Sequence, residues 1–445
     1  MGKKEVLSKV ALRVEKKKKN KFGRFWRILG PGLITGAADD DPSGIATYSQ
    51  TGAQFGYGQL WTAFFMLPLM VAVQEACARI GQVTGRGIVA IIKDNYRREI
   101  VVAVVSLILI ANTINIGADI GAMAAAARLV VPMNFIVPVL AFTAFILILE
   151  IFVSYKVYAR ILKWLAVSLF SYVLTMLIVH EPWLTLIKAT FVPHFEFSFA
   201  FLFIITGVLG TTISPYMFFW EANEEVEEER EKHLIKKDGR PRISLKNIKA
   251  MRLDNFLGMI FSEIVTWCII VTTATVLHGH GFMNIATSAD AARALEPLVT
   301  SFPNAGFVAK IIFSFGIIGL GLLAVPVLSG SASYAVAEAF SWRAGLNYKL
   351  KRAHGFYGVI TIATLIGLLI NFIGIDPMKA LVVTAVINGV VAVPLIFLIA
   401  KIANDKKVMG EFKSGLWSNI FVWLTFAAMG LAAVAMFYAI IHPGL

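Results

Sequence analysis

The chain has 445 residues, of which 58% are hydrophobic and only 16% are charged. A soluble globular domain carries about 25% charged residues, so this composition excludes a water-soluble protein and predicts an integral membrane protein. In a soluble protein, the net charge of +13 would suggest a nucleic-acid partner. Here the basic residues lie in short loops between apolar runs, so we expect the lipid bilayer, and no nucleic acid, as the partner.

Eleven apolar stretches follow one another along the chain, and each is long enough to cross a bilayer, which requires about 20 residues. They predict an all-α protein with 11 transmembrane helices. The stretches lie near residues 29–52, 58–82, 101–127, 134–155, 160–179, 197–220, 253–277, 306–340, 357–373, 377–402 and 417–441. We expect a cytoplasmic basic tail over 1–28 and one transmembrane domain over 29–445, with a charged cytoplasmic loop over 221–252.

The basic residues of the loops are unevenly divided between the two sides of the membrane. Most of them fall on the side of the N-terminus, whereas the opposite loops hold only Arg128, Lys188, Arg293 and Lys379. Under the positive-inside rule, this division places the N-terminus in the cytoplasm. With an odd number of spans, the C-terminus then lies outside the cell membrane.

Acidic residues gather at the start of the predicted 221–252 loop, in the segment EANEEVEEERE. Such a segment is either an acidic vestibule that attracts cations or a solvated helix end that its charges keep in water. The solvated helix end is the simpler explanation.

The first predicted span, GPGLITGAADDDPSGIATYSQ, contains three consecutive aspartates at positions 39–41, about half-way across the bilayer. Pro42 cannot donate to the helical ladder, Gly44 loosens it, and Ser43 can cap a restarting helix, so we expect two half-helices. A charged side chain at this depth costs about 2.5–3.5 kcal/mol even on a lenient scale. Three aspartates therefore require cations, protonation or water. The alternative is a proline kink whose acids reach an interface or pair with bases.

The sixth predicted span is also expected to break into two half-helices. Its sequence, ITGVLGTTISPYMFFWE, places Thr211, Ser214 and Pro215 at its middle. Spans 1–5 and spans 6–10 would then form two repeats, each opening with a broken helix, and the second repeat is inverted because five is odd. This arrangement is typical of secondary transporters that coordinate a cation at the midplane with unwound backbone carbonyls.

Both interrupted segments resemble motifs of one family. GPGLITGAADDDPSGIATY is similar to the first-helix motif of the Nramp divalent-metal transporters, Asp-Pro-Gly-Asn, and LGTTISPYMFF is similar to their sixth-helix motif, Ala-Thr-Val-Met-Pro-His. The resemblance extends over essentially the whole chain. It implies a LeuT-like fold, with the broken helices 1 and 6, and transport of manganese or iron with protons.

The resemblance also implies roles for individual residues. Asp41 falls on the family's metal-binding aspartate, and Gly44 falls on its binding asparagine. In the sixth span, Thr211 matches the alanine that offers its carbonyl, Ser214 matches the methionine ligand, and Tyr216 matches the histidine linked to proton coupling.

Further residues are expected in an additional cation site or along the ion pathway. Asp119 resembles the family's third-helix aspartate, and Asn112 stands where an acidic residue is expected one or two turns earlier. In the tenth span, Asn388 lies near the position of a glutamine that reaches the metal. An ionisable residue inside a span is a functional candidate, or else a buried carboxyl satisfied by its neighbours. By this criterion we add Asp39, Asp40 and Glu263.

The departures from the family motifs indicate a different ion. Methionine is a soft ligand that favours transition metals, and Ser214 replaces it here. With Gly44 in place of asparagine, the site should gain volume. Magnesium keeps several waters and is usually held by one or two carboxylates, so an acidic all-oxygen site suits it. The pattern resembles the Nramp-related magnesium transporter branch, which implies uptake without proton coupling.

The leading hypothesis is therefore a secondary transporter that takes up hydrated divalent cations by alternating access, Mg²⁺ first and Mn²⁺ also, without protons. The alternative is a proton-coupled Mn²⁺/Fe²⁺ transporter of the Nramp type. Three aspartates disfavour a sodium-coupled organic solute transporter of the same fold, because they would repel a carboxylate. An intramembrane enzyme with Asp41 and Asp119 as a catalytic pair has no supporting signature. We expect no enzymatic activity, no cofactor and no obligate protein partner, and a monomer suffices.

Overall fold

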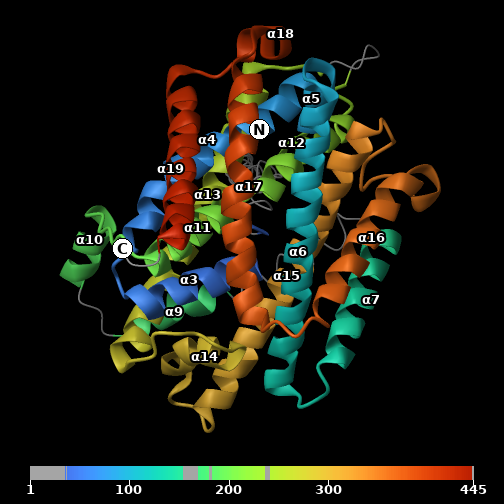
Figure 1. The fold of residues 1–445 in the computed structure, drawn as a ribbon. Helices are drawn as coiled ribbons and strands as arrows, with labels where there is room; N and C mark the ends of the chain where they lie inside the picture. Colours follow the sequence, from blue (N-terminus) through green and yellow to red (C-terminus); the bar gives the residue numbers. More distant parts are fainter. Residues whose placement is uncertain (1–35, 37, 154–168, 180–182, 236–240, 443–445) are drawn as a thin grey trace, which may run out of the picture.

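The computed structural model describes residues 36, 38–153, 169–179, 183–235 and 241–442, and this part of the chain is almost entirely helical (Figure 1). Its helices are α3 (Pro42–Phe55), α4 (Trp61–Thr84), α5 (Ile88–Asn95), α6 (Arg98–Val130), α7 (Ile136–Phe152), α9 (Phe170–Ile178), α10 (Trp183–Phe191), α11 (Phe199–Thr212), α12 (Pro215–Glu231), α13 (Leu245–Val276), α14 (Ser288–Ala292), α15 (Ala305–Ala339), α16 (His354–Ile370), α17 (Pro377–Asn404), α18 (Lys406–Met409) and α19 (Leu416–Ile441).

Seven helical segments of the described chain are long and apolar enough to cross a membrane. They are α4, α6, α11 with α12, α13, α15, α17 and α19, while α7 and α16 are apolar but have only 17 residues each. The beginnings of the predicted spans 29–52 and 160–179 lie outside the described residues. The protein is thus a helical, multi-pass membrane protein, and the count of 11 spans stays a prediction.

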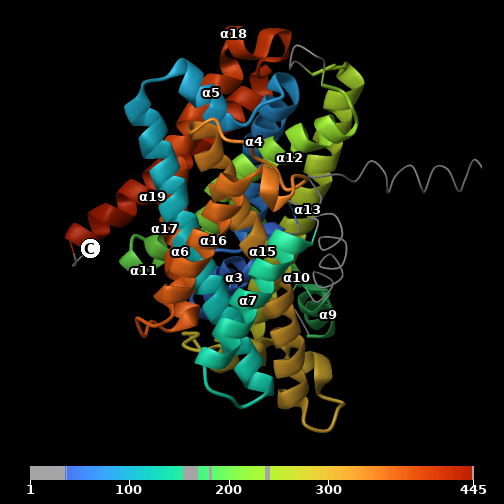
Figure 2. The same ribbon diagram turned by 90° about the vertical axis from the view of Figure 1, so that its right-hand side faces the viewer.

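Contacts between the helices follow the exchange that two five-span repeats predict. α3, the second half of the first predicted span, packs on α13, and α12, the second half of the sixth, packs on α4. In the predicted repeat, span 1 corresponds to span 6 and span 2 corresponds to span 7. The contact of span 1 with span 7 (α3 with α13) is therefore equivalent to the contact of span 6 with span 2 (α12 with α4). The same pairing relates the contact of α6 with α16 to that of α15 with α7, and Figure 2 shows these four helices together.

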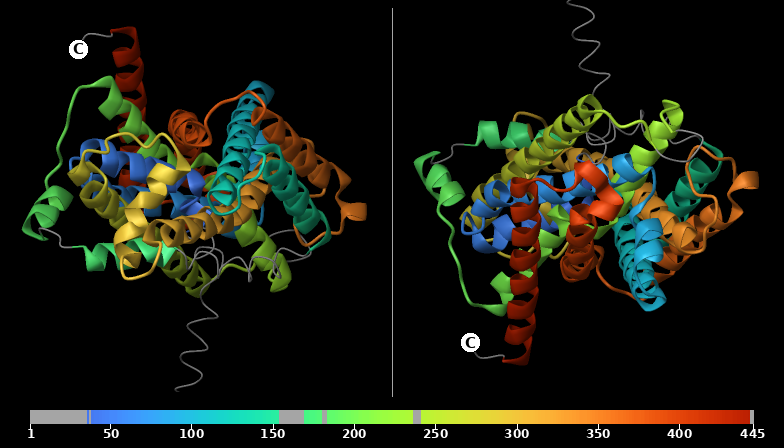
Figure 3. Two further views of the ribbon diagram at one scale, coloured as in Figure 1. Left: turned by 90° about the horizontal axis from the view of Figure 1, so that it is seen from below. Right: turned by 90° about the horizontal axis from the view of Figure 1, so that it is seen from above.

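The eleventh predicted span lies outside this repeat. It corresponds to α19, which stands at the edge of the helix cluster when the molecule is viewed along its length (Figure 3). Only one narrow stripe of α19 is buried, formed by Val422, Thr425, Met429, Ala433 and Met436. The rest of the helix presents apolar side chains outward, as expected for a surface that faces lipid.

Segments predicted to lie on the same side of the membrane gather at the same end of the molecule. α5 and α18 lie at one end, and α14 lies at the opposite end (Figure 1). The basic loops around α5 and α18 therefore lie at one end of the molecule. The predicted orientation can then be tested with one labelled position at each end.

Labelling of introduced cysteines should show which end faces the cytoplasm. The two native cysteines, Cys77 and Cys268, are 0% and 1% exposed, so they give little background. Lys351 and Ser301 are exposed and lie in loops at opposite ends of the fold. A membrane-impermeant maleimide added to intact cells should label Ser301→Cys and leave Lys351→Cys unlabelled until the cells are opened. The reverse pattern would show that the N-terminus is outside.

The acidic segment after residue 220 is not the start of a loop. α12 continues through Glu231, so the predicted 221–252 loop is shorter, and the acids at 221, 225, 227 and 229 are buried. Glu227 accepts hydrogen bonds from the Tyr334 hydroxyl at 2.6 Å and from the Asn347 amide at 2.7 Å. The prediction of a solvated helix end is wrong, because α4 and α15 pack against this helix and bury four of its acids.

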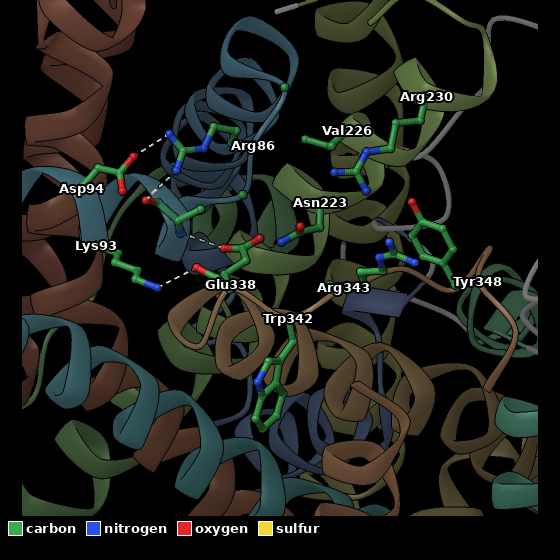
Figure 4. Close-up of a pocket in the computed structure, with 15 residues that line it drawn as sticks. Arg86, Lys93, Asp94, Asn223, Val226, Arg230, Glu338, Trp342, Arg343 and Tyr348 are labelled. Atoms are coloured by element: carbon green, nitrogen blue, oxygen red, sulfur yellow. Dashed lines mark hydrogen bonds and ion pairs between the residues drawn. The ribbon is translucent and has the colours of Figure 1, made fainter. Parts of the chain in front are cut away.

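A cavity of about 300 Å³ lies at the end of the molecule that carries α5 (Figure 4). It contains none of the predicted site residues. Across it, Lys93 donates to the Ser341 hydroxyl at 2.8 Å, and the Glu338 carboxylate of α15 accepts from the Ala90 backbone N–H at 3.0 Å. Glu338 thereby caps the N-terminus of α5, where an anion is favourable.

Replacing Gly87 by alanine should break the capping contact between α5 and the Glu338 carboxylate of α15. A Cβ at this position would lie 1.8 Å from Glu338 Oε1, so the carboxylate must leave its capping position. Losing such a cap costs about 1 kcal/mol. We expect a lower thermal unfolding temperature for Gly87→Ala. The control is Gly358→Ala in α16, where a Cβ would meet nothing within 4 Å. Equal unfolding temperatures for the two variants would contradict the capping role.

Candidate metal site

The interruption of the first span lies at Asp40 and Asp41, and α3 begins directly after it. The backbone of Asp41 is extended, with ψ 174°, and Pro42 occupies the first helical turn. Asp41 Oδ1 accepts from the Gly44 backbone N–H at 2.8 Å and from the Ser43 hydroxyl at 2.6 Å. The sequence argument named Ser43 as the helix cap, but the cap is Asp41. Ser43 lies inside the first turn and helps to hold the carboxylate.

The second carboxylate oxygen of Asp41 binds two other helices. Oδ2 accepts from the Tyr216 hydroxyl of α12 at 3.1 Å and from the Asn115 amide of α6 at 3.2 Å. The Tyr216 hydroxyl therefore lies beside the Asp41 carboxylate, and its match to the histidine of the family motif stays a prediction. The four donors hold Asp41 in one orientation.

Asn115 is a site residue that the sequence argument missed. It precedes Asp119 by four residues, so both lie on one face of α6, and this spacing is the signal that could have identified it. Asn112, which the resemblance matches to an acidic position of the family, donates to the Leu328 carbonyl of α15 at 2.9 Å. That match stays a prediction, and the α6 contact to Asp41 comes from Asn115.

The sixth span breaks where its sequence predicts. α11 ends at Thr212 and α12 begins at Pro215, with two residues between them. The Ser214 hydroxyl turns back toward α11 and donates to the Thr211 carbonyl at 2.5 Å. Proline at the first helical position costs no hydrogen bond, so the interruption follows directly from Pro215.

Hydroxyl groups join the two interrupted spans. The hydroxyls of Ser43 and Thr211 lie 3.3 Å apart, and those of Tyr48 and Thr212 lie 2.9 Å apart. A Cβ at Gly44 would lie 3.2 Å from the Tyr48 ring and 3.3 Å from the Thr211 hydroxyl. The gain in volume expected from Gly44 is therefore absent at this point, because Tyr48 and Thr211 already pack there.

The four predicted ligands, Asp41, Gly44, Thr211 and Ser214, are all buried. Tyr216 beside them is also 0% exposed. Within the described residues, no three His, Cys, Asp or Glu side chains are grouped around a point where they could hold a metal ion. An ion at Asp41 would meet that carboxylate and neutral oxygens from carbonyls, hydroxyls and its own waters, and the Asp119 carboxylate is close enough to act on the site electrostatically.

Asp39 and Asp40 face a different helix from Asp41. The Ser262 hydroxyl of α13 lies 3.0 Å from Asp39 Oδ2 and 3.2 Å from Asp40 Oδ1. Glu263 follows Ser262 on α13 and is 5% exposed. We call Asp39, Asp40, Ser262 and Glu263 the α13 cluster.

The two remaining predicted residues are buried without partners. Asp119 on α6 and Asn388 on α17 are both 0% exposed, and none of their side-chain oxygen or nitrogen atoms has a hydrogen-bond partner within the described part of the chain. Neither is hydrogen-bonded to Asp41. Their place in the site stays a prediction.

Two interrupted helices that meet at a buried carboxylate define the class of this protein as a LeuT-like helical membrane protein. The fold is shared with the solved structure of Mhp1, a nucleobase-cation-symport-1 family transporter, with a TM-score of 0.52, 12% identity, and coverage of 93% of this chain and 90% of that one. It is also shared with a manganese transporter from Eremococcus coleocola, with a TM-score of 0.73, 15% identity, and coverage of 94% and 87%.

The chain belongs to the Nramp family. The family model described as natural resistance-associated macrophage protein-like matches residues 32–439. The divalent metal cation transporter MntH of Klebsiella pneumoniae strain 342 is 26% identical over 408 residues, which cover 90% of this chain and 91% of that relative. The resemblance seen in the two interrupted segments is thereby confirmed at the level of the family.

Proposed function

We propose that this chain is a divalent metal cation transporter in which Asp41 anchors the ion. The observation that carries the proposal is the position of Asp41, a buried carboxylate at the point where the breaks of the first and sixth spans meet. Its four hydrogen-bond donors come from three helices, so an ion that displaces them would act on all three. The similarity to transporters named for divalent metals and for manganese supports the same function.

The comparisons favour manganese as the ion. They agree with the alternative drawn from the sequence, a proton-coupled Mn²⁺/Fe²⁺ transporter, because the similar proteins carry names that refer to divalent metals or manganese.

The residues at the site favour a broader choice that includes magnesium. Ser214 offers a hydroxyl where the family has a methionine, so the predicted ligands are all oxygen, and oxygen ligands do not exclude hard ions. The replacement of methionine by Ser214 is the observation on which we base both the proposal of magnesium transport and the assignment of this chain to the magnesium transporter branch.

The same site supports transport without protons. Tyr216 replaces the histidine of the family relay, and its reference pKa near 10 keeps a tyrosine neutral at physiological pH. It binds Asp41 directly at 3.1 Å. Asn115, the α6 residue on the same carboxylate, does not titrate. Asp119 remains as a buried acidic residue of that helix, so the relay is shortened rather than removed.

A liposome experiment separates the two versions of the function. The purified protein is reconstituted, and uptake of Mg²⁺, Mn²⁺ and Ca²⁺ is measured together with internal pH under a fixed membrane potential. Saturable uptake of Mg²⁺ and Mn²⁺ without acidification is expected. Acidification that tracks the metal load would establish the proton-coupled alternative, and uptake of Mn²⁺ with no Mg²⁺ would remove the magnesium proposal. Absence of any metal uptake would contradict the function itself.

The proposal also includes the membrane, the orientation and the oligomeric state of the transporter. We place it in the cytoplasmic membrane with its N-terminus inside, and we treat residues 29–445 as one transport domain that works as a monomer. The likeness to Mhp1, at 12% identity, supports the fold alone. Residues 39–41 would repel an organic solute that carries a carboxylate.

A further inference from the structure

We propose that the α13 cluster is a second cation site, which binds a hydrated divalent cation independently of Asp41. The inference rests on the proposed function, since it assigns a further ion position to the same transporter. Its ligands are carboxylate oxygens and one hydroxyl, all at the interface of α13 with the interruption that precedes α3.

One hydroxyl serves two carboxylates in this cluster. Ser262 Oγ lies within hydrogen-bond distance of both Asp39 and Asp40, but a serine has a single hydroxyl proton and can donate it to one of them at a time. The other oxygens, Asp39 Oδ1 and Asp40 Oδ2, have no partner within the described residues. The protein itself thus leaves this pair of carboxylates under-satisfied.

Glu263 provides an independent observation that points to a ligand. Its side chain is 5% exposed, and neither Oε1 nor Oε2 has a hydrogen-bond partner in the described part of the chain. It interacts electrostatically with Asp39 and with Asp40. A buried carboxylate that interacts with two other carboxylates inside a membrane protein is costly unless a positive charge offsets their repulsion.

No basic side chain supplies that charge within the described residues. The ion pairs seen there involve none of the three acids of the cluster. Four carboxylate oxygens therefore remain free to bind a cation. Ligands of this kind suit magnesium, calcium and manganese, which prefer oxygen.

The spacing of the cluster favours a hydrated ion. Among the residues that the structure describes, no three acids are gathered closely enough to hold a bare metal ion. An ion that keeps part of its water shell can bridge the carboxylates of the cluster through those waters, as magnesium commonly does.

The cluster shares no donor with Asp41. The donors to Asp41 are Ser43, Gly44, Asn115 and Tyr216, of which the last two lie on α6 and α12. The cluster is completed by α13 instead. Since Asp41 binds α6 and α12 whereas Asp39 and Asp40 face α13, removal of the Asp41 charge should leave the cluster able to bind.

Manganese binding to the purified full-length protein tests this independence. Free Mn²⁺ is followed by electron paramagnetic resonance, in the presence of physiological sodium chloride, for Asp41→Asn and for the double variant Asp41→Asn/Glu263→Gln. The single variant should bind one Mn²⁺, and the double variant should bind at least tenfold more weakly. A matched control is Asp41→Asn/Glu150→Gln. Glu150 is another buried glutamate in a membrane helix, but it binds Ser329 of α15 and lies outside the cluster. This control should keep the bound ion.

Two results would overturn the inference. One is the absence of Mn²⁺ binding in a folded Asp41→Asn protein. A cluster that binds sodium and no divalent cation would give this same result. The other is equal binding in the Glu263→Gln and Glu150→Gln double variants. If the Glu263→Gln protein does not fold, Asp40→Asn replaces it in the same comparison. These outcomes are separate from the proposed function, because wild-type metal uptake in liposomes is measured without reference to the cluster.

Discussion

Asp41→Asn should reduce saturable metal uptake to the level of protein-free liposomes while the protein remains folded. The Asp41 carboxylate lies at the meeting point of the two breaks, and asparagine removes its charge without changing its size. A divalent ion held by neutral oxygens alone would lose its main electrostatic attraction in a buried site.

The structure explains why folding should survive this change. Asp41 Oδ1 caps α3 through the Gly44 N–H, and an asparagine carbonyl oxygen caps a helix as well as an aspartate does. Asp41→Ala removes the cap as well and should cost about 1 kcal/mol of stability. Uptake and thermal unfolding are measured for both variants. Normal uptake by Asp41→Asn would show that the ion does not bind there.

The sequence was sufficient to place the two interruptions. Pro42 and Pro215 cannot donate to a helical ladder, and each now stands at the start of a half-helix. The residue that caps the first of them was misjudged, because Asp41 and Ser43 are both good caps and only the backbone geometry decides between them.

Side-chain direction at the first break could not be predicted. Three consecutive aspartates look equivalent in sequence, yet Asp41 binds α6 and α12, whereas Asp39 and Asp40 face Ser262 on α13. The backbone leaves the helix between them, so no helical periodicity connects their directions.

The burial of the acids after residue 220 was also beyond a sequence argument. A run such as EEVEEERE is typical of a solvated surface, and its inward hydrogen bonds depend on partners more than 100 residues away. Tyr334, which donates to Glu227, is one example. Tertiary packing here overrides local composition.

Ser214→Met should raise the ratio of manganese to magnesium uptake by about tenfold, which corresponds to about 1.4 kcal/mol of differential binding. A thioether is a polarizable ligand that a transition metal uses better than a hard ion does. Ser214 stands between α11 and α12 and is 0% exposed, so a longer side chain there must enter the buried region around the break.

The matched control for this prediction is Ser214→Leu, which has nearly the same volume as methionine but no sulfur. Both variants lose the serine hydroxyl that donates to the Thr211 carbonyl, so any general disturbance of the break is common to them. Uptake of Mn²⁺ and Mg²⁺ is measured in competition in the same liposomes. If the ratio rises only in the methionine variant, the sulfur reaches the ion. If methionine and leucine give the same ratio, Ser214 does not line the site, and the choice of ion must be set by other residues.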